Sequence, residues 1–412
     1  MRVSLLRPLG VSLVLWPCLV FGQSVVPGRI TEAQALDLMA AHDQRLRAVR
    51  AGIEELRAAQ AGRALRTNPT LTFSRESVGD SHDDFFLGRQ ELDASGRLGR
   101  LRAAGLLAVE AAEATAQHQV VQLQSKVRDA FAVLVLAQDR ESVIARSLKE
   151  LENLLDILRT REQEGEGSRY DRMRGERALA EIEADLAAAS AARAEAQGRL
   201  AALVGAPDET ALVADGRTEP VPPAAGMATQ VERALATRAD LKALTLEAAR
   251  FQTERLAAGR LAIPTPTLSG GLKRSRVDQQ ERSGYVFSLD LSVPLFDRGR
   301  PAAALAIAQT TGAQARAATL RQLIETEIRV AHAVAEIHRR NAERYRASTS
   351  KTGDDLLAVA RLGYEEGELG ILELLDAVRQ ALDGRVRALE MTAAARRAVI
   401  ELDRIVGLEI NP

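Results

Sequence analysis

Apolar residues recur every three or four positions over most of this chain. One stretch of the first half carries them at Leu148, Leu151, Leu155 and Leu158. A stretch of the second half repeats the pattern at Ile371, Leu375, Val378, Leu382, Val386 and Leu389. Such steps are typical of the narrow apolar stripe along which helices pack in a coiled coil. The pattern predicts two very long helices, over about residues 96–164 and 299–366, each followed by an antiparallel returning helix.

Two shorter regions instead alternate apolar and polar residues, which is the period of a β-strand with one apolar face. The clearest face consists of Tyr285, Phe287, Leu289, Leu291 and Val293. The sequence predicts β-hairpins over residues 69–93 and 266–294, with polar loops at residues 79–84 and 277–283. Either this apolar face meets lipid, or it is the edge of a soluble sandwich.

The chain contains one structural plan twice. The tract Asn68-Pro69-Thr70-Leu71 returns about 200 residues later as Thr265-Pro266-Thr267-Leu268, a period far longer than that of solenoid repeats. Each copy is predicted to hold an opening helix (about residues 31–66 or 229–262), a hairpin, a long helix and a returning helix. The expected units are residues 23–205 and 229–412, joined by a proline-rich connector, 206–228. Each long helix would be a rod of roughly 100 Å.

The N-terminus has the features of an export signal. Arg2 and Arg7 precede an apolar stretch that ends before the small residue Gly22, so residues 1–22 are predicted to be a signal peptide. The only cysteine, Cys18, lies inside it, and whether a lipid is attached there stays open. No later apolar run is long enough for a transmembrane helix.

Composition narrows the possible functions further. The 412 residues include 55 basic and 56 acidic side chains, interspersed, so nucleic acid is not an expected partner. No catalytic or cofactor motif is present, so we expect neither an enzyme nor a cofactor. The histidines, such as His332 and His338, are scattered, so no metal site is predicted. The polar loop around His82 either holds a cation weakly or is simply solvated.

One chain supplies only four strands, whereas the smallest outer-membrane barrels have eight. Strands in lipid must close into a barrel so that no backbone group is left unpaired. If the strands enter a membrane, several chains must share one barrel.

Specific motifs then point to a family. Two strand-to-helix junctions are similar to those of the TolC family of outer-membrane efflux proteins, in its CzcC-like heavy-metal branch. They are Gln90-Glu91-Leu92 through Ser95-Gly96-Arg97 and Val293-Pro294-Leu295-Phe296-Asp297-Arg298-Gly299. The resemblance covers essentially the whole mature chain. It implies a mainly α fold with a small transmembrane β part. Duplicated coiled-coil hairpins would form a periplasmic α-barrel, and a homotrimer would close a 12-stranded β-barrel.

The same resemblance implies a function. The chain would be a passive exit duct in the bacterial outer membrane, with a long periplasmic portion, for heavy-metal cations. Its partners would be a periplasmic adaptor (membrane fusion) protein, an inner-membrane RND-type pump and outer-membrane lipid. One alternative is a type I secretion or drug-efflux duct of the same family. A periplasmic coiled-coil adaptor or structural protein is an alternative of another class.

The resemblance also assigns candidate sites. Glu373, Asp376, Asp171 and Tyr364 match a periplasmic gate in which acidic residues surround the closed entrance. From their spacing alone, Glu373 and Asp376 would be interpreted as an ordinary solvated helix face. The family's usual basic partner of the Asp171 position is replaced by Leu369, with Arg169 and Arg172 as neighbouring candidates. The expected adaptor-docking tips are Gly165, Gly167, Ser168, Gly367 and Gly370, although helix-reversing glycines would look the same. The lipid-facing strand is Tyr285, Phe287, Leu289, Leu291 and Val293.

Overall fold

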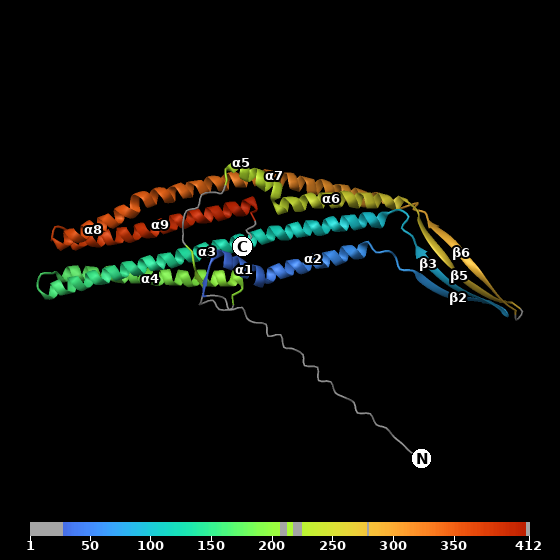
Figure 1. Ribbon diagram of the computed structural model, residues 1–412, viewed down its shortest axis with the longest axis horizontal. Coiled ribbons are helices and arrows are strands. Elements are labelled where there is room, and N and C mark those ends of the chain that lie inside the picture. Colours follow the sequence, from blue (N-terminus) through green and yellow to red (C-terminus); the bar gives the residue numbers. More distant parts are fainter. Residues whose placement is uncertain (1–27, 207–211, 217–224, 278–279, 409–412) are drawn as a thin grey trace, which may run out of the picture.

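The computed structural model describes residues 28–206, 212–216, 225–277 and 280–408. The expected signal peptide lies outside these residues, as does most of the expected connector. The chain forms a long helical rod with a β-sheet at one end and two helix-reversing turns at the other (Figure 1). This elongation separates the sheet from the turns by the length of the rod.

The first copy of the plan begins with α1 (Glu32–His42) and α2 (Gln44–Arg63). Strands β2 (Thr70–Val78) and β3 (Ser81–Glu91) follow, and then α3 (Arg97–Gln163) and α4 (Arg169–Val204). Helix α3 is an unbroken α-helix of 67 residues, as its sequence predicted. The opening helix is divided at Asp43, whose carboxylate caps α2 by accepting a 2.7 Å hydrogen bond from the Arg45 backbone N–H.

The second copy opens with α5 (Met227–Thr237), α6 (Ala239–Gly259) and the 3₁₀ turn η2 (Arg260–Ala262). Strands β5 (Thr265–Val277) and β6 (Gln280–Ser292) follow. The chain then forms α7 (Arg300–Tyr345), the π-helical turn η3 (Arg346–Ser350), α8 (Lys351–Glu365) and α9 (Ile371–Val406).

The prediction of a continuous α-helix over residues 299–366 was therefore wrong at η3. The hydroxyls of Ser348 and Thr352 donate to the carbonyls of Arg344 and Ser348, at 2.9 and 2.7 Å. Such bonds to the preceding turn compete with the regular backbone ladder and bend helices. The same bonds occur at Thr310 and Thr326 in the regular part of α7, so η3 is a single π-helical turn in an otherwise continuous helical run and these bonds alone do not explain it.

The four longer strands form one antiparallel sheet in the order β2-β3-β5-β6. The predicted loops at residues 79–84 and 277–283 were too long, because Ser81–Asp84 and Gln280–Ser283 are paired strand residues. Cross-strand ion pairs, Arg75 with Asp84 and Arg276 with Glu281, bridge the strands there. Gly271 lets β3 and β5 approach closely, since a Cβ there would lie 1.8 Å from the Phe86 carbonyl oxygen.

A second, unpredicted pairing ties the beginning of the described chain to the middle. Strand β1 (Arg29–Ile30) pairs in parallel with β4 (Val213–Ala214). The Val213 N–H donates to the Gly28 carbonyl and the Asp215 N–H to the Ile30 carbonyl, both at 2.8 Å. The expected connector therefore contains a strand that docks on the rod.

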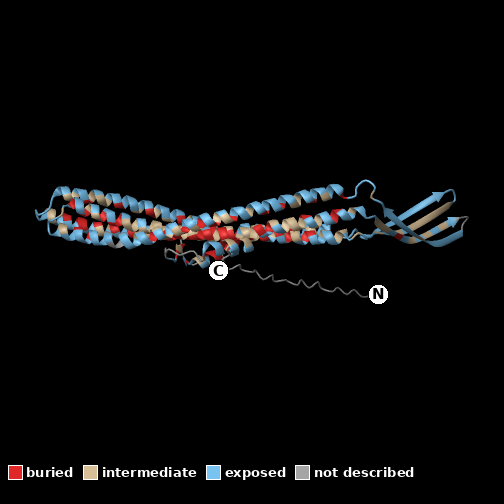
Figure 2. Cartoon of the chain, turned by 90° about the horizontal axis from the view of Figure 1, so that it is seen from above, coloured by how far each residue is buried: buried red, intermediate tan, exposed pale blue. Residues whose placement is uncertain are grey.

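Buried side chains form three clusters along the inside of the helix stack, whereas the sheet is largely exposed (Figure 2). The first cluster surrounds Leu134 and Leu200 near the middle of the rod. The second joins α3 and α4 to α8 and α9 around Leu155 and Leu374. The core thus unites the two copies at the end that carries the reversing turns.

Candidate functional site

The two reversing turns, which we call the tips, have the same backbone structure. Gly165 and Gly367 adopt the left-handed conformation, with φ of 78° and 77°, which glycine reaches without strain. Two residues later, the N–H of Gly167 donates to the Arg161 carbonyl at 2.8 Å, and the N–H of Leu369 donates to the Gly363 carbonyl at 2.9 Å. These glycines end one helix and reverse the chain, and both left-handed residues are exposed.

The tips differ in how the returning helices begin. The Ser168 hydroxyl caps α4 by accepting a 3.1 Å hydrogen bond from the Tyr170 N–H. Gly370 precedes α9 without a side-chain cap, and a Cβ there would lie 2.8 Å from the Glu373 carboxylate. At Gly167 a Cβ would lie 2.8 Å from the backbone nitrogen of Glu162, so this turn requires glycine.

The two candidate gate acids lie at the start of α9. Glu373 and Asp376 are both exposed and line a cavity of about 440 Å³ between α8 and α9. The Gln380 side-chain amide donates to the Asp376 carboxylate at 2.6 Å. Neither acid forms a salt bridge within the described residues, so their negative charge is not neutralised inside one copy of the chain.

The other two gate candidates, Asp171 in the first repeat and Tyr364 in the second, interact electrostatically. Burial raises the pKa of the Tyr364 phenol, and the Asp171 carboxylate raises that pKa further. Arg161 lies over the Tyr364 ring, 5.7 Å from its centre. The suggested partner Arg172 is occupied elsewhere, since it binds Glu162 at 2.5 Å and Glu176 at 2.7 Å. Arg161 is therefore the basic residue that contacts Tyr364.

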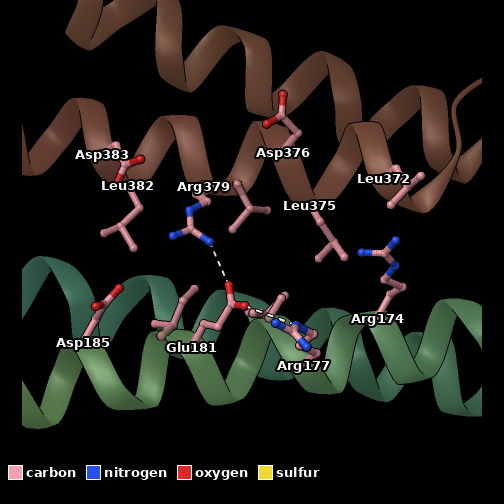
Figure 3. Close-up of a pocket in the computed structure, with 14 residues that line it drawn as sticks. Arg174, Arg177, Glu181, Asp185, Leu372, Leu375, Asp376, Arg379, Leu382 and Asp383 are labelled. Carbon is pink, nitrogen blue, oxygen red and sulfur yellow. Dashed lines mark hydrogen bonds and ion pairs between the residues drawn. The ribbon is translucent and has the colours of Figure 1, made fainter.

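A groove of about 250 Å³ runs between the returning helices α4 and α9 near the tips (Figure 3). Arg379 crosses it and donates to the Glu181 carboxylate at 2.7 Å. Leu151, Ile182 and Leu375 contribute apolar lining. In Figure 3 the Asp376 carboxylate points away from α4, toward α8. Sequence reasoning missed this groove because no pattern within one helix indicates what faces it from the other copy.

The predicted lipid-facing residues lie on one face of the sheet and are exposed in the single chain. Tyr285 is 91% exposed and Phe287 73%. The strand register extends this face, because Leu272 lies opposite Tyr285 and Leu268 opposite Leu289. Val293 lies one residue beyond the end of β6 and is also exposed. The sheet thus presents a continuous apolar surface that no described residue outside the sheet covers.

A polar network near mid-rod was also missed. Arg128 on α3 donates to Glu32 on α1 at 2.7 Å and to Asp403 on α9 at 3.0 Å. Arg396 on α9 binds the same Glu32. Burial raises the pKa of Asp403, and Arg128 opposes that rise. These contacts join residues up to 364 positions apart, a distance over which a single sequence carries no signal.

Metal-binding residue types do not gather into a site in the part of the chain that the structure describes. Among the described residues, no three His, Cys, Asp or Glu side chains lie close enough together to hold a metal ion. The residues around His82 belong to β3, where Asp83 binds Lys273 at 2.6 Å and Asp84 binds Arg75 at 2.5 Å. Half-buried His118 lies 3.8 Å from Asp240, and burial lowers its pKa.

Over the part of the chain that is described, no helix has both the length and the apolar character needed to cross a bilayer.

Comparison with known proteins gives sequence relatives. Residues 231–408 match the family model "Outer membrane efflux protein". The cobalt-zinc-cadmium resistance protein CzcC of Cupriavidus metallidurans is 24% identical over 400 residues, which cover 94% of each chain. The nickel-cobalt-cadmium resistance protein NccC of Alcaligenes xylosoxydans xylosoxydans is 26% identical over 56% of this chain and 52% of its own.

Solved structures share the fold. A membrane protein from Pseudomonas aeruginosa superposes with a TM-score of 0.73 at 21% identity, covering 91% of this chain and 93% of the other. The transmembrane channel CusC gives 0.73 at 17% identity, with 91% of both chains covered. The outer-membrane channel OprN gives 0.71 at 21% identity, covering 91% and 89%.

These relatives agree with the sequence motifs and with the architecture. Proteins of this kind are passive channels, not enzymes, and lie in the bacterial outer membrane with a long helical part in the periplasm. Residues 231–408 match the outer membrane efflux protein family, and the chain as a whole is similar to proteins of the TolC family that its junction and tip motifs resemble.

Proposed function

We propose that this chain is the outer-membrane exit duct of a tripartite efflux system and that it works as a homotrimer. The observation that carries the proposal is the uncovered apolar face of a four-stranded sheet at the end of the rod. Strands β2 and β6 are edges with unpaired backbone groups, which lipid does not tolerate. Three copies would join these edges into a 12-stranded barrel, with Tyr285, Phe287, Leu289, Leu291 and Val293 facing lipid.

Helix α7 supports assembly with further copies. Exposed apolar residues lie along one of its faces at steps of seven, four and three: Leu323, Val330, Val334 and Ile337. A seam with this spacing packs against another helix. No helix of the same chain covers it within the described residues, so its occupant in our proposal is a second copy.

The domain organisation follows from the same proposal. Residues 1–22 would be removed on export, and the mature chain would begin at Gln23. The repeats, residues 23–205 and 229–412, would each contribute one hairpin, one rod and one tip. A trimer would then place six hairpins around the barrel and six tips around the periplasmic entrance.

We assign adaptor docking to Gly165, Gly167, Ser168, Gly367 and Gly370. The tips are the most distant exposed turns from the sheet, where a periplasmic adaptor would connect the duct to an inner-membrane RND-type pump. Their common backbone geometry would present six similar surfaces to such a partner. The same glycines also have a purely structural role, because they reverse the chain.

We assign the periplasmic gate to Glu373 and Asp376, and we assign its closure to Tyr364, which Arg161 contacts and on which the Asp171 carboxylate acts through space. In a trimer, six carboxylates without salt-bridge partners would surround one entrance, attract cations and repel anions. We propose heavy-metal cations as the cargo. The names of CzcC and NccC support this choice, and the acidic entrance suits it.

Conductance across planar bilayers tests the duct and its gate. We expect the trimer to form cation-selective pores that divalent cations block. Glu373→Ala and Asp376→Ala should each weaken that block, whereas Asp383→Ala, an exposed acid further along α9, should not. Unchanged block and selectivity in both gate variants would remove the gate assignment, and absence of pores would remove the duct.

Growth of a deletion strain tests the cargo separately. Loss of the protein should sensitise cells to cobalt, zinc or cadmium, and the intact gene should restore resistance. Sensitivity to organic drugs without sensitivity to metals would overturn the metal assignment while leaving the duct intact.

A further inference from the structure

The exposed apolar face of the sheet changes character close to the hairpin turns. The strand register defines cross-strand rows of residues that share this face. The last apolar row is rich in aromatic residues: Phe73, Phe86, Leu272 and Tyr285. The next row toward the turns is Arg75, Asp84, Arg274 and Ser283, and the row after it is Ser77, His82, Arg276 and Glu281. We call these two polar rows the basic belt.

The basic belt carries excess positive charge. Its three arginines face two carboxylates, and Arg75 binds Asp84 while Arg276 binds Glu281. Arg274 is the arginine without a carboxylate partner of its own. It is exposed, acts on Asp84 only through space and forms no salt bridge within the described residues. One guanidinium per chain is therefore available to an anion from outside.

The opposite end of the same face has no such charge. The rows there are Gln90, Leu268 and Leu289, followed by Pro266 and Leu291. The strands continue into the periplasmic helices at that end, so the basic belt lies on the outer side of the membrane. Aromatic residues collect where a barrel passes from hydrocarbon to headgroups, and the row of Phe73, Phe86 and Tyr285 marks that level.

The belt begins two residues, or about 7 Å, beyond the aromatic row along each strand. That places Arg274 at the depth of the lipid headgroups. We infer that the basic belt, with Arg274 as its central residue, binds the phosphate groups of outer-leaflet lipid. A guanidinium suits this ligand because its planar fork donates two hydrogen bonds to phosphate oxygens. The inference rests on the proposed function only in that the apolar face must meet lipid.

The opposite face of the sheet supplies a control. Arg282 neighbours Ser283 on β6, but its register partner is Ser275, which places it on the other face. Both arginines are exposed and lie near the turns. Arg274→Ser and Arg282→Ser therefore remove the same charge at a similar height, one on the belt and one away from it.

The test uses detergent-solubilised trimer titrated with diphosphorylated lipid A, with dephosphorylated lipid A, and with sodium phosphate as competitor. Bound lipid is counted by native mass spectrometry. We expect Arg274→Ser to weaken binding of the diphosphorylated lipid about fivefold, Arg274→Lys to weaken it less, and Arg282→Ser to leave it unchanged. Inorganic phosphate should not displace the lipid.

Equal binding of both lipids, or an equal loss in Arg282→Ser, would overturn the inference. Displacement by inorganic phosphate would overturn it too, because it would indicate a site for free phosphate. Conductance of the same preparations separates this inference from the proposed function. Arg274→Ser should form normal pores, whereas wild-type protein that forms no trimer or pore would refute the duct itself.

Discussion

The guanidinium of Arg161 lies 5.7 Å from the centre of the Tyr364 ring. Arg161 belongs to the last turn of α3, and Tyr364 to the last turn of α8, so the contact joins the two tips of one chain. The Asp171 carboxylate acts on the same phenol. In the proposed duct, any dilation that separates the two repeats of one chain at the entrance must break this contact.

Arg161→Ala should therefore make the closed entrance easier to open. Both residues are partly exposed, and a cation–π contact is worth at least about 0.5–1 kcal/mol there, which corresponds to roughly a two- to fivefold rise in open probability. Single-channel recording in planar bilayers measures this. Arg159→Ala is the matched control, because its partners Asp156 and Glu176 both lie in the first copy. An equal rise in the control would show that the effect does not come from Tyr364.

The long helices could be predicted from the sequence because each one repeats its apolar stripe many times. The leucines of α3 recur at steps of three and four from Leu148 to Leu158, and the tips are marked by glycines, which reach the left-handed conformation of the turns without strain. The outer parts of the strands were missed for the opposite reason. Asp84 and Glu281 are polar residues of an exposed sheet. No buried face requires apolar and polar residues to alternate there, so only the cross-strand partners reveal the pairing.

Some features of the candidate site could likewise be predicted from the sequence, and others could not. The positions of Glu373 and Asp376 on one helix face follow from their spacing, and the structure places both on the same cavity. The contact of Arg161 with Tyr364 and the bond from Arg379 to Glu181 join different copies of the repeat. Such contacts depend on how two helix pairs pack, which one chain's periodicity does not specify.

The core near the tips should depend strongly on Leu374. This side chain is fully buried in the cluster that unites α8 and α9 with the first copy, so Leu374→Ala should cost about 2–5 kcal/mol of local stability. Leu372→Ala, which alters a leucine that is 49% exposed, should cost far less. Hydrogen exchange of the α8 and α9 amides is the measurement. Equal protection in the two variants would contradict the placement of Leu374.

The partly buried carboxylate of Asp403 should give the rod a distinct pH dependence. Burial raises the pKa of this group in the folded protein above the ordinary value near 3.8. The folded state therefore holds the proton more tightly than the unfolded state, and the stabilisation due to that proton is lost as pH rises through the folded-state pKa. Wild-type protein should lose this contribution above about pH 4, whereas Asp403→Asn should not.

Thermal unfolding of trimers at a series of pH values measures the effect. The difference in midpoint between Asp403→Asn and wild type should shift in favour of the variant as pH rises above the ordinary value near 3.8 and through the raised folded-state pKa. Parallel curves for the two proteins over this range would show that Asp403 does not titrate with a raised pKa.

Leu289→Arg tests whether the exposed apolar face meets lipid. Leu289 lies in the middle of that face, and an arginine at the bilayer midplane of a barrel costs about 2–4 kcal/mol. We expect fewer heat-modifiable trimers in outer-membrane fractions, as measured by gel mobility with and without boiling.

Ser288→Arg is the control, because the neighbouring residue points to the other face of β6. In the proposed barrel that face lines a water-filled lumen, where arginine keeps its hydration, so this variant should assemble normally. Normal assembly of both variants would place the Tyr285–Val293 face away from lipid, whereas failure of Ser288→Arg alone would mean that the two faces had been exchanged.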